Sequence, residues 1–201
     1  MSVIRVPLKQ GINFELLYLM ILPPPFIEGT HNINAIVETP KGSRNKYAYD
    51  EKTDIVKLKK ALPAGMIFPF DFGFIPSTIA EDGDPMDILV LTDAPTFPGC
   101  LVEAKVLGII KVEQEKKGEK VRNDRVIAVQ LDSRLYSSAD SIDDLPDGLV
   151  KEIINFFASY NNVSEDVFNH LENGGPGIAI ELIRNSIKKA INDNKENKKT
   201  Y

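Results

Sequence analysis

Three aspartates, Asp82, Asp84 and Asp87, lie close together just before an apolar run. Their carboxylate oxygens are hard ligands, which suit magnesium, manganese or calcium better than zinc. Gly83 permits a tight turn and Pro85 fixes the chain between two of the acids, so the three side chains can converge on one point. Without a cation they would repel one another and their pKa values would rise. The segment therefore predicts a divalent-cation site.

A plain acidic surface turn is the alternative interpretation of this segment, because Asp and Gly favour turns in any protein. An EF-hand calcium loop does not fit, since no glutamate stands at the closing position and no pair of helices flanks the segment. The residue types alone leave the cation site and the surface turn both open.

Few residues are present for other catalytic chemistries. The one cysteine, Cys100, cannot form an internal disulfide, and we interpret it as a small core residue in a protein of a reducing compartment. The two histidines, His31 and His170, share no motif, which argues against a zinc site or a Ser-His-Asp triad.

The composition is that of a globular protein. Of 201 residues, 43% are hydrophobic and 26% are charged, with a formal net charge of −5. The length suits one domain with a substantial core. An acidic chain lacks the basic surface of a nucleic-acid-binding protein, and its phenylalanines are not interleaved with Lys and Arg. We therefore expect no nucleic-acid partner.

Strand-like runs broken by Pro and Gly dominate the first two thirds of the chain, which favours antiparallel β structure. The longest run, 101–112, is expected to bend at Gly108 around a barrel corner. The charged segment 113–124 is expected to be a loop. The predicted strands are 35–39, 47–49, 55–58, 88–91, 101–112 and 126–131.

Apolar residues recur at helical spacing in two later segments, 149–160 and 178–191. A Gly- and Pro-rich segment, 173–177, separates them. The prediction is a single α+β domain, mainly β, in which helices are added to a barrel late in the chain.

The N-terminal segment 12–22 is apolar and follows two basic residues, as in a signal peptide. Glu15 interrupts the run, prolines follow it and no cleavage site is evident, so we do not expect export. The run is also too short to cross a bilayer, and we expect a cytoplasmic protein without a membrane partner. Translation from Met20 is an alternative in which residues 1–19 are not native.

Residues 82–88 resemble the Asp-x-Asp-Pro-x-Asp signature of the family I soluble inorganic pyrophosphatases. Four other segments resemble that family in the same order, and such an ordered set is much more specific than the aspartates alone. These segments are 38–47, 68–76, 125–129 and 154–160. We assign 31–192 to the pyrophosphatase domain, 1–30 to an N-terminal extension and 193–201 to a polar tail.

The resemblance implies a five-stranded closed barrel of OB type with flanking C-terminal helices. It also implies hydrolysis of pyrophosphate to two phosphates with Mg²⁺, or Mn²⁺ as an alternative. A homo-oligomer, a hexamer in many bacterial members, is implied as well. By position, Asp82, Asp84 and Asp87 are metal ligands, and Asp84 also orients and helps to deprotonate the attacking water. The matching substrate-binding positions are Glu38, Lys46, Lys60, Arg125 and Tyr160.

Several positions depart from the family pattern, and the second acidic loop is the most altered. The departures are Ala48 for a glutamate, Lys60 for an arginine, Phe68 and Phe72 for tyrosines, Gln114 and Asn123 for metal-binding aspartates, and Arg125 and Asn161 for lysines. A displaced carboxylate from Glu113, Glu115 or Asp124 is one interpretation of this loop, and a surface turn is the other.

Three functional hypotheses follow. The first is a divergent, magnesium-dependent inorganic pyrophosphatase. The second is a phosphohydrolase with an altered diphosphate substrate, since the lost charges of the second loop would open the site to a larger group. The third is a barrel that has lost catalysis and only binds metal or phosphate.

Overall fold

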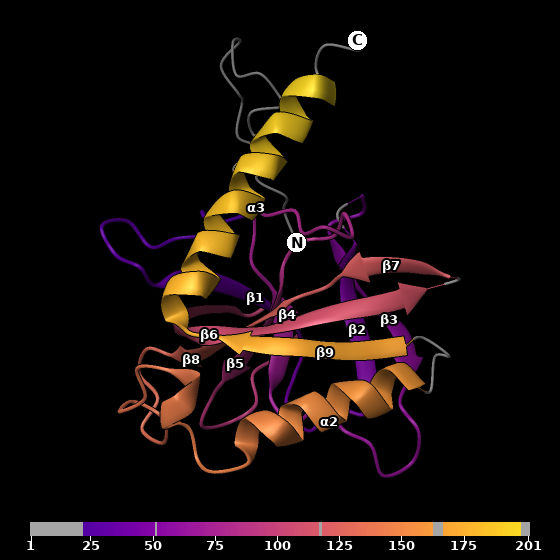
Figure 1. Ribbon diagram of the computed structural model, residues 1–201, viewed down its shortest axis with the longest axis vertical. Helices are drawn as coiled ribbons and strands as arrows, with labels where there is room; N and C mark the ends of the chain where they lie inside the picture. The colour runs from indigo at the N-terminus through magenta and orange to yellow at the C-terminus, as the bar shows by residue number, and fades with distance from the viewer. Residues whose placement is uncertain (1–21, 51, 117, 163–166, 198–201) are drawn as a thin grey trace, which may run out of the picture.

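The computed structural model describes residues 22–50, 52–116, 118–162 and 167–197 (Figure 1). The alternative start and all but the last residue of the signal-like segment lie outside these residues, as does most of the proposed N-terminal extension. No helix in the described ranges has the length and apolar character needed to cross a bilayer.

Five strands are hydrogen-bonded into a closed ring, as the five-stranded barrel prediction requires. Going round the ring, β1 pairs with β4, β4 with β5, β5 with β8, β8 with β6, and β6 again with β1. All these pairings are antiparallel except β5–β8. The strands are β1 Ile33–Thr39, β4 Asp71–Phe74, β5 Asp87–Leu91, β6 Leu101–Lys116 and β8 Arg125–Gln130.

The long strand β6 pairs with four other strands, which its 16 residues make possible. Its first half pairs with β1 and β8, and its second half pairs with β7 (Glu119–Arg122) and β9 (Val167–Gly174). The register against β8 shifts between Val106 and Gly108, where the sequence predicts the bend. A Cβ at Gly108 would lie 2.5 Å from the carbonyl oxygen of Gly174, so the close approach of β9 requires glycine there.

The prediction of a loop at 113–124 is wrong, because most of that segment forms the ends of β6 and the whole of β7. Strands β4 and β9 were also not predicted. β4 has only four residues, and β9 is largely polar, so neither shows a clear period-two pattern. Pairing with longer neighbours stabilises both.

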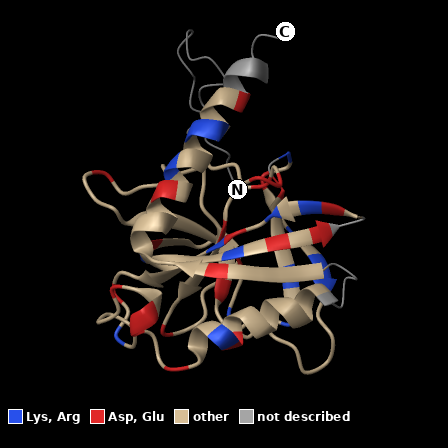
Figure 2. Ribbon diagram, viewed as in Figure 1, with Lys and Arg blue, Asp and Glu red and all other residues tan. Residues whose placement is uncertain are grey.

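The strands β2 (Asn45–Asp50) and β3 (Ile55–Ala61) form a separate two-stranded sheet, close to the predicted positions. Basic residues gather on this hairpin (Figure 2). Both predicted helices are present: α2 at Leu149–Asn162 is slightly longer than predicted, whereas α3 at Pro176–Asn197 is much longer and includes the first residues of the predicted polar tail. A short 3₁₀ helix, Ile142–Asp144, precedes them.

Two apolar cores lie on either side of the sheet. Alternate residues of β5 point to opposite faces, so that Leu89 and Leu91 join the core covered by α2, while Ile88 and Val90 join the core covered by α3. This double burial explains why β5 is apolar after its first residue, Asp87. Cys100 is partly buried at the edge of the second core, where burial raises the pKa of its thiol.

The two helices lie at opposite ends of the molecule (Figure 1). The apolar face of α2 packs against the first core, with Ile153 and Phe157 fully buried there. In α3, Ile183 is fully buried, whereas Ile191 is half exposed, because the C-terminal half of the helix extends beyond the sheet. The predicted apolar stripe of α3 therefore packs against the second core from Ile180 to Ile187, and Ile191 at its end is exposed.

A glycine at the β1–β4 contact gives a stability prediction. A Cβ at Gly73 would clash with the backbone carbonyl of Ile36. Gly73→Ala should therefore lower the free energy of unfolding by roughly 3 kcal/mol, the upper end of the usual cost of overpacking. Urea denaturation measures this. The matched control is Gly177→Ala in α3, where the added methyl meets open space and should be neutral or slightly stabilising. Equal stabilities of the two variants would contradict the prediction.

Candidate active site

A cleft of about 720 Å³ lies between the β2–β3 hairpin, the loop before β5 and the end of α2. It is lined by residues from widely separated segments, and most of the predicted site residues are among them. These are Glu38, Lys46, Lys60, Asp84, Asp87, Arg125 and Tyr160. Asp82 does not line the cleft, but its carboxylate accepts a hydrogen bond from the backbone N–H of Asp84 at 3.2 Å.

The loop that carries the aspartates is fixed at its base by buried hydrogen bonds. The backbone N–H of Ile75 donates to the carbonyl of Met86 at 3.0 Å. The buried Thr78 hydroxyl donates to the Ile75 carbonyl at 2.6 Å and accepts from the Met86 N–H at 3.0 Å. Asp87, the first residue of β5, therefore has a defined position, while Asp84 lies in the exposed part of the loop.

Asp87 is a carboxylate whose charge the protein only partly balances. Burial raises its pKa to about 6, although Arg125 and Lys46 both act to lower it. The Nε of Arg125 lies 3.7 Å from an Asp87 oxygen, too far for a hydrogen bond, and this nitrogen is buried without a partner in the described residues. A bound cation would relieve this imbalance.

Lys46 lines the cleft with a side chain that is 15% exposed. Its Nζ lies 3.3 Å from an oxygen of Glu38 and 3.9 Å from the centre of the Phe72 ring. Burial lowers the pKa of Lys46, while Glu38 and Asp87 oppose that shift. Phe72, which stands where the resemblance has tyrosine, thus offers its ring face to a cation in place of a hydroxyl.

Two further cations of the cleft also lie against aromatic rings. Lys60 Nζ is 4.4 Å from the centre of the Tyr160 ring. The guanidinium of Arg125 is 4.3 Å from the Phe157 ring, and burial lowers its pKa while Asp87 opposes this. The aromatic residues of α2 therefore determine where these positive charges lie.

A chain of three carboxamides forms another wall. Gln114 Nε2 donates to Asn161 Oδ1 at 3.1 Å, and Asn123 Nδ2 donates to Gln114 Oε1 at 3.2 Å. Asn161 Nδ2 in turn donates to the carbonyl of Phe157 at 2.9 Å. Gln114 and Asn161 are each only 3% exposed. This wall is polar but carries no charge.

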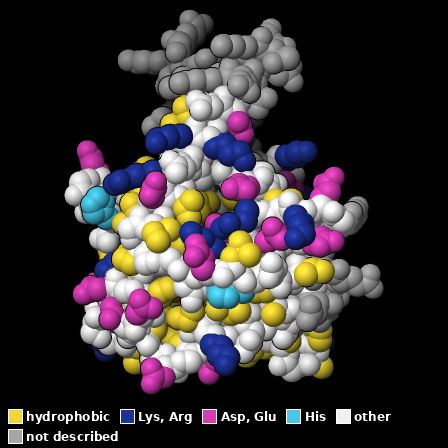
Figure 3. All heavy atoms as spheres, in the orientation of Figure 1, with side chains coloured by type: hydrophobic (Ala, Val, Ile, Leu, Met, Phe, Trp, Pro, Cys, Tyr) yellow, Lys and Arg dark blue, Asp and Glu magenta, His cyan; other side chains and the backbone are white. Residues whose placement is uncertain are grey.

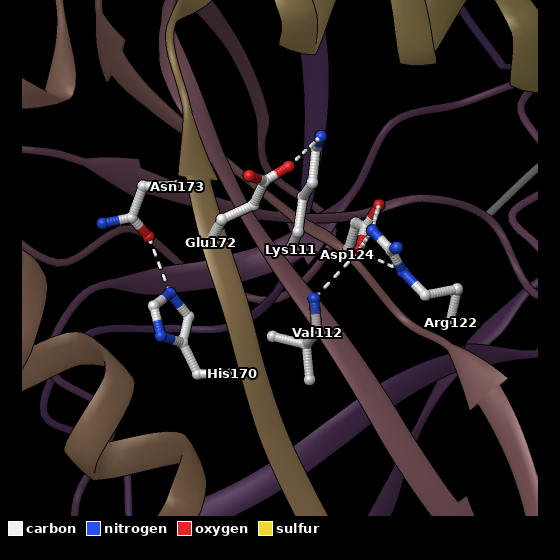
Figure 4. Close-up of polar contacts among 7 residues, drawn as sticks. All are labelled: Lys111, Val112, Arg122, Asp124, His170, Glu172 and Asn173. Carbon is white, nitrogen blue, oxygen red and sulfur yellow. Dashed lines mark hydrogen bonds and ion pairs between the residues drawn. The ribbon is translucent and has the colours of Figure 1, made fainter.

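The nearby carboxylates of segment 113–124 are engaged outside the cleft, as Figure 4 shows for the contacts of Asp124 with Arg122 and Val112. Asp124 accepts from the backbone N–H of Val112 at 2.9 Å and from the guanidinium of Arg122 at 2.7 and 2.8 Å. Glu113 pairs with Lys120 at 2.9 Å. Neither acid lines the cleft, and neither does Glu115. The interpretation that a displaced carboxylate from this loop faces the site is therefore wrong.

Several cleft residues were not predicted. Lys59 and Lys52 come from the β3 strand and the β2–β3 turn, and Tyr49 donates its backbone N–H to Glu38 Oε1 at 2.8 Å. The density of lysines in β3 was the available signal. Which of these lysines face the cleft depends on how the hairpin folds over the barrel, and the sequence alone does not show this.

As the side chains are placed, no three His, Cys, Asp or Glu groups among the described residues form a ready cluster for a metal ion. The donor chemistry nevertheless fits a hard divalent cation. Asp84 and Asp87 present carboxylates to one cleft, and burial raises the pKa of Asp87 in spite of the nearby Arg125 and Lys46. Magnesium is more compatible with such oxygen ligands than zinc is.

Comparison with known proteins agrees with this geometry. The model of the family described as inorganic pyrophosphatase matches residues 35–191. The chain belongs to the inorganic pyrophosphatase family. Its relatives include the inorganic pyrophosphatase of Methanosarcina acetivorans, 34% identical over 162 residues that cover 81% of this chain and 94% of that protein. The inorganic pyrophosphatase of Thermus thermophilus is 42% identical over 128 residues, or 64% and 71% of the two chains.

Solved structures of inorganic pyrophosphatases share the fold. The crystal structure of the Thermus thermophilus enzyme has a TM-score of 0.76 and 33% identity, covering 84% of this chain and 96% of that one. An inorganic pyrophosphatase from Neisseria gonorrhoeae has a TM-score of 0.77 and 30% identity, covering 86% and 98%. These similarities confirm the predicted family and the OB-type, mainly β fold.

The charge on Asp87 gives the protein a testable pH dependence. Its pKa is about 6 in the folded protein and 3.8 as the unperturbed value. Between these values the folded state binds more protons than the unfolded state, so the free energy of unfolding falls as pH rises. In EDTA near pH 7.5, Asp87→Asn should therefore be more stable than the wild type by roughly 2 kcal/mol, with little difference near pH 4.

Urea denaturation at both pH values measures the effect, with Glu81→Gln in the same loop as a control that should change neither value. Excess Mg²⁺ near pH 7.5 should then stabilise the wild type more than Asp87→Asn. A stability gain that is the same at both pH values would contradict the assigned role of the carboxylate charge.

Proposed function

We propose that this protein hydrolyses inorganic pyrophosphate to two phosphates, with Mg²⁺ bound by Asp82, Asp84 and Asp87. Mn²⁺ is the expected substitute. Membership of the inorganic pyrophosphatase family supports the reaction. The observation that carries the proposal is the single cleft in which Asp84 and Asp87 lie together with Lys46, Lys60 and Arg125.

The aspartate loop supplies the activating side of the site. When bound, Mg²⁺ neutralises phosphate charge and makes water a better nucleophile near neutral pH. Asp84 exposes its carboxylate to the cleft, so it can orient a water molecule and accept its proton. Asp87 is fixed by β5, and because its charge is buried and only partly balanced, a bound cation would stabilise the ionised form.

The cations of the cleft supply the substrate-binding side. Lys46, Lys60 and Arg125 hold positive charge where phosphate oxygens would lie, in a site that is partly shielded from water. The ion pair with Glu38 fixes the position of the Lys46 ammonium, so this charge stays on the substrate-binding side of the cleft. Tyr160 sets the position of Lys60 through its ring and lines the cleft itself.

The uncharged wall bears on a second candidate function. Gln114, Asn123 and Asn161 contribute amide groups but no negative charge, so that wall attracts divalent cations less than carboxylates would. A neutral, hydrogen-bonding wall also suits a diphosphate that carries a larger organic group. Phosphate release from pyrophosphate and from nucleoside diphosphates, compared at equal concentration, separates the two functions. Cation binding without turnover on either substrate would instead favour a binding-only barrel.

We further infer a cytoplasmic protein that assembles as a homo-oligomer, with a hexamer as the family-based expectation. On the face shown in Figure 3, Lys and Arg side chains are interspersed with Asp and Glu, so that face presents no continuous basic stripe for nucleic acid. Light scattering of the purified protein would measure the oligomeric state.

The role of Asp84 gives the central activity prediction. Asp84→Asn should lower kcat for pyrophosphate hydrolysis by about 10²–10⁴-fold, because an amide cannot accept the proton of the attacking water. Phosphate release is measured while Mg²⁺ is titrated from zero to saturation. Glu81→Gln is the matched control, since Glu81 lies in the same loop but outside the cleft, and it should retain full activity. Normal turnover by Asp84→Asn at saturating Mg²⁺ would remove Asp84 from the mechanism.

A further inference from the structure

The C-terminal helix α3 reaches the aspartate loop through two hydrogen bonds. The backbone N–H of Ile79 donates to the carbonyl of Ser186 at 3.2 Å. The ammonium of Lys189 donates to the carbonyl of Ala80 at 2.5 Å, and this contact joins residues 109 positions apart. Both bonds involve the middle of α3, the long helix shown in Figure 1.

Ala80 is the residue on which the tip of the loop closes. Its N–H donates to the carbonyl of Asp84 at 2.8 Å, and its carbonyl accepts from the N–H of Gly83 at 3.3 Å. The same carbonyl receives the Lys189 ammonium, so one helix side chain contacts the turn that contains Asp82 and Asp84. A charged donor makes a stronger bond to a carbonyl than a neutral one does.

Side-chain packing between the helix and the loop is incomplete. A hollow of about 240 Å³ lies between them, lined by Ile79, Ala80, Leu182, Ser186 and Lys189. Glu81, Asp124 and Arg122 are the other charged residues that line this hollow, and Asp124 is paired with Arg122 at 2.7 Å. A hollow lacks the close contacts of a packed interior, so side-chain packing holds the loop only weakly here. The hydrogen bonds that the loop makes with Ser186 and Lys189 therefore contribute more than packing to the position of the loop.

We infer that Lys189 is a positioning residue for the Asp82–Asp84 turn, acting on cation binding through the carbonyl of Ala80. The inference rests on the proposed function for its effect on turnover, whereas its effect on cation binding and loop order does not need turnover. Lys189 touches neither the cleft nor a reacting atom, so it acts on affinity for the cation rather than on the chemical step.

The test compares Lys189→Met, which keeps an apolar stem but has no donor, with Lys188→Met on the exposed side of the same helix. Binding of Mn²⁺ is measured by electron paramagnetic resonance, and hydrogen exchange of residues 79–84 by mass spectrometry. Lys189→Met should weaken Mn²⁺ binding by about tenfold, the effect of losing one charged hydrogen bond, and should speed exchange in the loop. Lys189→Arg should restore most of the affinity, and Lys188→Met should match the wild type.

Turnover separates this inference from the proposed function. With both correct, Lys189→Met needs about tenfold more Mg²⁺ for half-maximal phosphate release but reaches nearly the wild-type kcat at saturation. Unchanged Mn²⁺ affinity and loop exchange in Lys189→Met, with an active wild type, would overturn the positioning role alone. The predicted Mn²⁺ and exchange shifts in a protein that releases no phosphate would overturn only the proposed function.

Discussion

The structure depends on the hydrogen bonding of one long strand. β6 closes the five-strand ring by pairing with β1 and β8, and its far half then extends past the ring to hold β7 and β9. The same half presents Gln114 to the cleft and Glu113 to the outside, since successive side chains of a strand point to opposite faces. A one-residue change of register in β6 would therefore replace Gln114, one of the three amides of this wall, by a carboxylate.

The cleft balances opposite charges in a partly desolvated space. Lys46 and Arg125 lie near Glu38 and Asp87, and burial lowers the pKa of both cations while it raises that of Asp87. Aromatic faces of Phe72 and Phe157 hold the cations instead of further carboxylates. The protein thus leaves part of the negative charge for a bound cation, and the positive charge is placed for an anionic substrate.

The neutral wall and the helix–loop contact both show how residues distant from the aspartates affect the same cation site. The site carries less negative charge because its wall is made of three amides, Gln114 from β6, Asn123 from the turn before β8 and Asn161 from α2. Lys189 affects the order of the loop from α3. Charge and order are separate contributions to cation affinity, so variants of the two regions should have distinguishable effects.

The sequence by itself determined the family, the aspartate motif and the two helices, because each is written in local spacing of residue types. It also indicated the long strand and its irregularity at Gly108. Only the tertiary structure decided that β9 and β7 exist, that Asp124 pairs with Arg122 instead of facing the cleft, and that Lys189 contacts Ala80. These outcomes depend on strand register and on contacts between distant segments, which local periodicity does not encode.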